Sequence, residues 1–114
     1  FYGTQKFSSP EALSKQFYVL EEQEVWALGT LLYVLLFKMD PFANDEEILD
    51  LNISYRIRAL RTRPYGKNNP PIQISDEAAE SISMMLSKVP EERPQIAQLL
   101  DLPIFQLNRD ENDE

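Results

Sequence analysis

The sequence predicts an all-α fold of about five helices. Acidic residues follow candidate capping residues, apolar residues recur with a helical period, and proline marks the intervening segments. No stretch alternates apolar and polar residues convincingly, as a half-buried β-strand does. The 114 residues are enough for one small domain with a single core. We therefore expect every regular element of the chain to be helical.

The first half of the chain predicts three helices. A short one begins at Ser8-Ser9-Pro10-Glu11, where a serine can cap, proline suits the first turn and glutamate faces the positive helix end. The strongest runs from Glu21 to Phe37. It is apolar nearly all round, so we expect burial on all sides, and Pro41 lies just beyond its end. A third helix is expected from Asn44 to about Ile53.

The second half predicts a connector followed by two helices. Residues 56–71 hold four prolines and glycines and five of the 11 basic residues, and we interpret them as a solvated connector. An alternative is that this basic segment binds a phosphate or an acidic partner. Helices are expected over 75–88 and 94–101, and residues 108–114 form a polar, acidic tail. The basic residues of the connector are Arg56, Arg58, Arg61, Arg63 and Lys67.

Charge and composition argue against several classes of function. The 11 basic and 19 acidic residues give a net charge of -8, which opposes non-specific binding to nucleic acid or an anionic membrane. The chain has neither His nor Cys, so it lacks the commonest general base and thiolate metal ligands. The longest apolar stretch, Val25 to Phe37, is shorter than the roughly 20 residues of a membrane span. We expect no nucleic-acid, membrane or metal site in this chain.

Four segments resemble consecutive parts of a Ser/Thr protein kinase domain. They are Gly3–Glu11 (GTQKFSSPE), Glu24–Tyr33 (EVWALGTLLY), Asp40–Phe42 (DPF) and Ile74–Phe105. In that order they are similar to the end of the activation segment, the central helix of the C-lobe, the turn after it and the last two helices. Within the kinases, the segments Glu24–Trp26, Phe37–Phe42 and Asp45–Leu49 look most like PAS kinases and their calmodulin-kinase-like relatives.

The resemblance implies that residues 1–107 are a kinase C-lobe fragment and the substrate-side part of the domain. The Gly-rich loop, strand lysine, catalytic loop and Asp-Phe-Gly site are not in the sequence, so it implies no catalytic or cofactor-binding residue here. It also implies a protein substrate, ATP and Mg in the complete domain, and a missing N-lobe and catalytic-loop half as partners. The expected location is intracellular, cytoplasmic or nuclear.

Two groups of residues are implied to form the substrate side. Glu11 and Arg93 are implied to pair as a structural latch, although both could be ordinary surface charges. The substrate platform is implied to consist of Thr4, Phe7, Ser8, Ser9 and Pro10. Within it, Thr4 would contact the catalytic Asp and Lys, or simply follow Gly3 in a turn. Phe7 stands in place of the usual Tyr, and Ser9 in place of the usual Ala.

The central helix carries the remaining implied roles. Glu24 replaces the usual Asp that anchors the catalytic loop, or it is an acid stabilised by the helix dipole. Val34 lies where many basophilic kinases carry a Glu that reads a substrate Arg, so selection for Arg through this site is not expected. The hydrophobic scaffold is implied to be Trp26, Leu28, Leu31 and Leu35.

Three readings of the chain stay open at this point. It is part of an active Ser/Thr kinase, part of a pseudokinase that acts as a regulatory or protein-interaction module, or an independent helical interaction domain. The kinase readings predict that Glu11 and Arg93 lie within salt-bridge distance. They also predict exposed apolar surface around Trp26 and Leu35, which the missing half of the C-lobe would cover.

Overall fold

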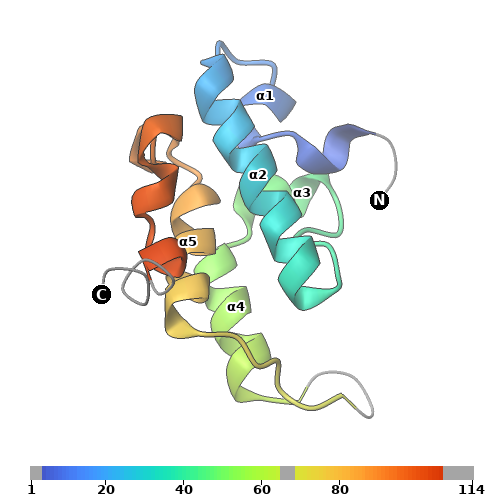
Figure 1. Cartoon of the computed structure of the whole chain (residues 1–114). Coiled ribbons are helices and arrows are strands. Elements are labelled where there is room, and N and C mark those ends of the chain that lie inside the picture. The colour runs from blue at the N-terminus through green and yellow to red at the C-terminus, as the bar shows by residue number, and fades with distance from the viewer. Residues whose placement is uncertain (1–3, 65–68, 107–114) are drawn as a thin grey trace, which may run out of the picture.

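The computed structural model describes residues 4–64 and 69–106, and each of its elements is helical (Figure 1). This confirms the all-α prediction. The tail at 108–114 and Lys67 lie outside the described residues. In chain order the elements are the 3-10 helix η1 (Thr4–Phe7), α1 (Pro10–Leu13), α2 (Leu20–Phe37), α3 (Asp45–Asp50), α4 (Ile53–Thr62), α5 (Asp76–Met85), and the 3-10 helices η2 (Pro90–Glu92) and η3 (Ile96–Asp101).

Helix α2 is the centre of the fold. This 18-residue helix packs against α5, and Gly29 permits the close approach, since a Cβ there would lie 2.8 Å from Met85 Cβ. Figure 1 shows α2 between α5 on one side and α1 and α3 on the other. No helix among the described residues is long and apolar enough to cross a membrane.

The main core lies between α2, α3, α4 and α5. Trp26 and Phe42 stack with their ring centroids 5.5 Å apart, and Tyr33 and Phe37 stack at 4.2 Å. All four side chains are at most 2% exposed. The buried members of this core are Trp26, Tyr33, Phe37, Phe42, Ile48, Ile53, Ile57, Ala79, Ile82 and Leu86.

The predicted burial of α2 on all sides is wrong. Leu28, Leu31 and Leu35 are 43%, 46% and 56% exposed. They lie along a side of α2 that no described element covers fully, opposite the side on which Trp26 and Tyr33 are buried. An apolar sequence indicates the capacity for burial, whereas actual burial needs a second surface.

The predicted connector is also wrong from Arg56 to Thr62, because these residues belong to α4. Leu51 has extended backbone and ends α3, and the Asn52 side chain then caps α4 by accepting the Tyr55 N–H at 3.2 Å. The helix predicted from 44 to about 53 is therefore α3, which ends slightly earlier, at Asp50, and the separate helix α4 begins at Ile53 and runs into the basic segment. Its apolar residues Ile53, Ile57 and Leu60 keep a helical period that the intervening arginines obscure.

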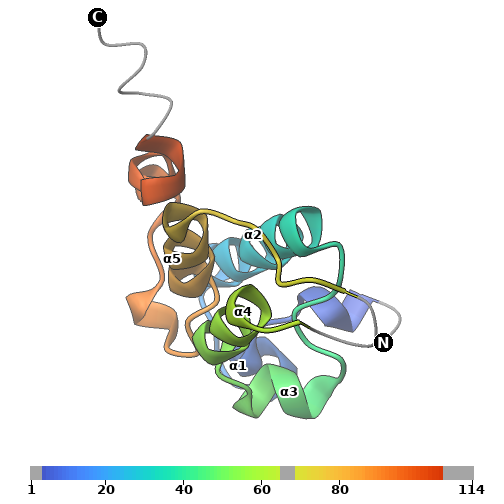
Figure 2. The ribbon, with the colours of Figure 1, turned by 90° about the horizontal axis from the view of Figure 1, so that it is seen from below.

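The C-terminal helices close one end of the molecule. Ser75 caps α5 by accepting the Ala78 N–H at 3.0 Å. The helix predicted over 94–101 is a 3-10 helix that starts after Gln95, and residues 103–106 are helical. Figure 2 shows this C-terminal segment beside α5 and away from α3.

Candidate functional site

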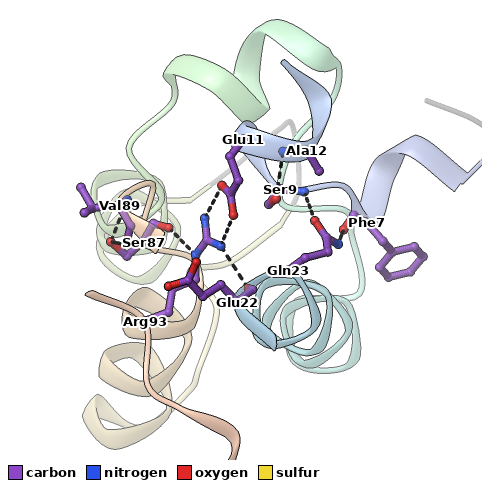
Figure 3. Close-up of polar contacts among 9 residues, drawn as sticks. All are labelled: Phe7, Ser9, Glu11, Ala12, Glu22, Gln23, Ser87, Val89 and Arg93. Carbon is purple, nitrogen blue, oxygen red and sulfur yellow. Dashed lines mark hydrogen bonds and ion pairs between the residues drawn. The ribbon is translucent and has the colours of Figure 1, made fainter. Parts of the chain in front are cut away.

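A buried ion pair joins residues from the two ends of the chain. Arg93 Nη1 donates to Glu11 Oε2 at 2.6 Å and Arg93 Nη2 donates to Glu11 Oε1 at 2.9 Å (Figure 3). The Arg93 side chain is 0% exposed and that of Glu11 is 8% exposed. Sequence reasoning predicted this contact, and the structure confirms its geometry. We call the pair the Glu11–Arg93 latch.

The guanidinium of Arg93 also holds neighbouring backbone. It donates from Nη1 to the Glu22 carbonyl at 3.0 Å and from Nε to the Ser87 carbonyl at 2.8 Å. Its carbon lies 4.9 Å from the centroid of the Trp26 ring. One side chain therefore connects α1, the first turn of α2 and the segment after α5, as the planar fork of arginine allows.

The environment of Glu11 favours its charged form. Burial alone would raise the pKa of Glu11. The hydrogen bond and the positive charge of Arg93, helped by hydrogen bonds from the backbone and from Ser9, instead hold this pKa below its ordinary value of 4.5. The pair is therefore ionised near neutral pH. Such charge-assisted, bidentate contacts are directional, so the latch fixes the orientation of α1 as well as its distance.

The segment just before the latch is tied to α2 by a residue that the sequence did not single out. Gln23 Nε2 donates to the Phe7 carbonyl at 2.9 Å, and Gln23 Oε1 accepts the Ser9 N–H at 2.8 Å (Figure 3). Ser9 is buried, and its Oγ caps α1 by accepting the Ala12 N–H at 3.3 Å. The sequence shows only that Gln23 lies in the first turns of the central helix, which does not predict its contacts with residues 7–9.

The other residues implied to form the platform lie next to these contacts. Phe7, Ser8 and Pro10 are half-buried, and the Phe7 ring points away from the latch (Figure 3). Lys6 Nζ lies 5.3 Å from the centroid of that ring and 3.5 Å from Asp40 Oδ1. Thr4 is the first residue of η1, but its side chain lies outside the described part of the chain.

The central helix divides its implied residues between two environments. Trp26 is fully buried in the core, so the predicted exposure around Trp26 is wrong. Glu24 is exposed in α2. Its implied partner, the catalytic loop, is not in this sequence, so the anchoring role stays a proposal.

Leu28, Leu31 and Leu35, expected to be core, instead line an apolar groove of about 330 Å³. Exposure around Leu35 is as the kinase readings predict. The lining residues of the groove are Leu28, Leu31, Leu32, Leu35, Met85, Leu99, Leu100 and Phe105.

Two arginines of the basic segment make contacts within the protein. Arg56 Nη1 donates to the Pro41 carbonyl at 2.7 Å and to Glu47 Oε1 at 3.1 Å. Arg61 Nη2 donates to Asp76 Oδ1 at 2.6 Å. Arg58 and Arg63 are exposed. The segment therefore orders α3 and α5 around α4, and part of its charge compensates local acids as expected.

Lys88 is a second residue that sequence reasoning missed. Its Nζ donates to the Ile48 carbonyl at 2.8 Å and lies 4.9 Å from the Phe42 ring centroid and 5.6 Å from that of Trp26. Burial lowers the pKa of Lys88 to about 8, against a smaller opposing effect of Asp50. The contact joins the segment after α5 to α3. Within the described ranges, no group of three or more His, Cys, Asp or Glu could hold a metal ion.

Comparisons with known proteins agree with this geometry. The family model described as "Protein kinase domain" matches residues 1–105. The chain is 34% identical over 100 residues to serine/threonine-protein kinase ppk6 of Schizosaccharomyces pombe, a match that covers 88% of the chain and 11% of the relative. It is 31% identical over 103 residues to the PAS domain-containing serine/threonine-protein kinase of Mus musculus, covering 90% of the chain and 6% of the relative.

A solved structure shares the fold. The crystal structure of the Rad53 kinase domain and SCD2 superposes with a TM-score of 0.63 at 20% identity, and the match covers 90% of this chain and 36% of that chain. At this identity the likeness shows the fold alone. The chain therefore spans about a third of that structure and about a tenth or less of the two curated relatives.

Proposed function

Since this chain belongs to the protein kinase domain family, we propose that it is the substrate-side part of a Ser/Thr protein kinase domain. The complete domain would transfer the γ-phosphoryl group of ATP, with Mg, to Ser or Thr of a protein substrate. This chain would present Thr4, Phe7, Ser8 and Pro10 as the surface under the substrate peptide, with the buried Ser9 beneath it. Because the reaction consumes ATP and acts on proteins, we place it inside the cell, in the cytoplasm or nucleus.

The single observation that carries the proposal is the Glu11–Arg93 latch together with the Gln23 contacts. Loops move unless their backbone is held, and a platform for a peptide needs a fixed backbone. Here α2 holds residues 7–9 and the latch holds α1 directly after them. The chemistry itself would come from groups outside this chain, because the sequence has no His and no Gly-rich loop.

The apolar groove supports the second part of the proposal, that the rest of the same domain is a partner. Leu28, Leu31 and Leu35 lie on successive turns of α2 and together form an exposed apolar side of this helix. An apolar groove open to solvent supports an interface at this place. We propose that the catalytic-loop half of the C-lobe covers it in the complete domain.

The exposed groove makes a prediction about the 114-residue chain alone. We expect it to self-associate at concentrations of tens of micromolar, and Leu31→Glu with Leu35→Glu to return it to a monomer in sedimentation velocity. Leu20→Glu is the matched control, because Leu20 is 65% exposed but outside the groove. A wild-type chain that stays monomeric, or a control that works equally well, would contradict an apolar interface at this place.

A chimera tests the proposed function. Residues 1–105 would replace the matching part of the kinase domain of the mouse relative, which is 31% identical over 103 residues. We expect the chimera to bind ATP and to phosphorylate a serine peptide that the parent domain phosphorylates. The chain alone is the negative control and should show neither an ATP-dependent thermal shift nor phosphotransfer.

The pseudokinase alternative rests on Glu24, whose carboxylate is one methylene longer than the usual Asp. A longer side chain would move the proposed catalytic-loop anchor, and so the loop. Glu24→Asp in the chimera separates the two readings. If transfer appears only after this change, the regulatory module is the better description of this chain.

A further inference from the structure

Gln23 makes two hydrogen bonds with the backbone of the preceding loop. Its amide nitrogen reaches the carbonyl before Ser8 and its amide oxygen reaches the N–H after Ser8, at 2.9 and 2.8 Å. A residue of a parallel β-strand makes the same two contacts with the residues on either side of its neighbour. One side chain therefore does for Phe7–Ser9 what an adjacent strand would do, in a region without a strand.

We infer that Gln23 is the positioning residue of the platform: it holds the backbone of residues 7–9 against α2 and thereby sets the affinity for the substrate peptide. The expected effect on peptide affinity rests on the proposed function, whereas the restraint of residues 7–9 rests on the two hydrogen bonds alone. Gln23 would touch neither ATP nor the transferred phosphoryl group, so it acts through the loop and not on the chemistry.

The other ties on this loop do not replace Gln23. The latch acts on Glu11, after the first residue of α1, and fixes the helix that follows the loop. Lys6 and Asp40 form an ion pair at 3.5 Å, with side chains 33% and 37% exposed. Exposed pairs of this kind contribute little to order. Gln23 holds residues 7–9, which lie between these two ion pairs and under the proposed peptide.

The contacts also constrain how a peptide could be read. The Ser9 N–H donates to Gln23, so it is not free to pair with a substrate backbone, and the Phe7 carbonyl already accepts one hydrogen bond from Gln23. Recognition at this place would then depend on the shape of the loop and on side chains such as the Phe7 ring. Replacing Gln23 would remove its hydrogen bonds to the Phe7 carbonyl and the Ser9 N–H, and the loop would become less fixed in shape.

The test uses the chimera defined above, with Gln23→Met as the main variant. Methionine has a similar length but can neither donate to Phe7 nor accept from Ser9. We expect the KM for the peptide to rise about tenfold, the scale of two lost hydrogen bonds, with the KM for ATP unchanged. Gln23→Glu should also raise the peptide KM, because a carboxylate cannot donate to the Phe7 carbonyl. Gln16→Met, at an exposed glutamine nearby, should change neither constant.

Hydrogen exchange at the Ser9 amide provides a readout that does not depend on activity. We expect exchange at least tenfold faster in Gln23→Met than in the unmodified chimera, with the melting temperature little changed. Equal exchange, an unchanged peptide KM, or equal changes in the KM for peptide and ATP would overturn the inference. If the unmodified chimera transfers no phosphate, the proposed function fails, while exchange of the Ser9 amide still decides whether Gln23 holds the loop.

Discussion

Replacing Arg93 with methionine should lower the free energy of unfolding of the chain by about 3–5 kcal/mol. The Glu11 carboxylate would stay in a site where its side chain is 8% exposed, without the guanidinium that now donates to both of its oxygens. The carbonyls of Glu22 and Ser87 would lose a donor at the same time. Urea unfolding followed by circular dichroism, at low protein concentration, measures the change.

The matched control is Arg63→Met, which removes the same charge from an exposed position at the end of α4. Arg63→Met should change the stability by less than about 0.5 kcal/mol. Equal effects of the two substitutions would show that the latch contributes nothing beyond net charge. Glu11→Gln should fall between them, because an amide keeps one acceptor for Arg93 and loses the charge.

Lowering the pH should weaken the Glu11–Arg93 latch and so lower the stability of the chain. The pKa of Glu11 is lower in the folded chain than its ordinary value of 4.5. The stabilisation is therefore complete above the unfolded pKa and is lost as the pH falls through the lower, folded pKa. The loss of stability below about pH 4.5 should be smaller in Glu11→Gln than in the unmodified chain, which titration of the urea midpoint would measure.

Replacing Trp26 with alanine should cost roughly 3–5 kcal/mol of stability. Trp26 is 0% exposed and stacks on Phe42, and the resulting cavity would lie at the centre of the main core. The change also removes the ring under the Arg93 guanidinium and near Lys88. Tyr55→Ala, at a side chain that is 70% exposed, is the control and should stay within about 1 kcal/mol. A loss below about 1 kcal/mol for Trp26→Ala would contradict this account of the core.

Trp26 and Arg93 should also be energetically coupled. The two side chains touch, so their substitutions should not be additive. In a double-mutant cycle, Arg93→Met should cost less in the Trp26→Ala background than in the wild type. Additive losses would mean that the ring and the latch act independently.

Much of this fold follows from short-range patterns. Asn44 and Ser75 cap helices where the sequence predicts them, because capping depends on residues only two or three positions away. The Glu11–Arg93 contact could be predicted only from the family resemblance, since 82 residues separate the partners. Helix α4 was missed because Asn52 was not recognised as a cap and the arginines that follow it were interpreted as part of a connector.

Other features depend on how the helices are arranged in space, which the sequence patterns do not predict. Leu31 and Leu35 are as apolar as buried residues, and only the arrangement of the helices shows that they face outward. Gln23 and Lys88 bind carbonyls of distant segments, and a carbonyl carries no sequence signal because every residue has one. Such residues are found from structure.

The phosphotransfer rate of the chimera on a serine peptide tests the central proposal most directly. It would be measured beside the unmodified mouse kinase domain, after a thermal shift has shown that both proteins bind ATP. We predict a kcat/KM for the peptide within about a hundredfold of the parent, which corresponds to at most about 2.7 kcal/mol of lost transition-state stabilisation. A folded, ATP-binding chimera that transfers no phosphate with Glu at position 24 would contradict the proposal.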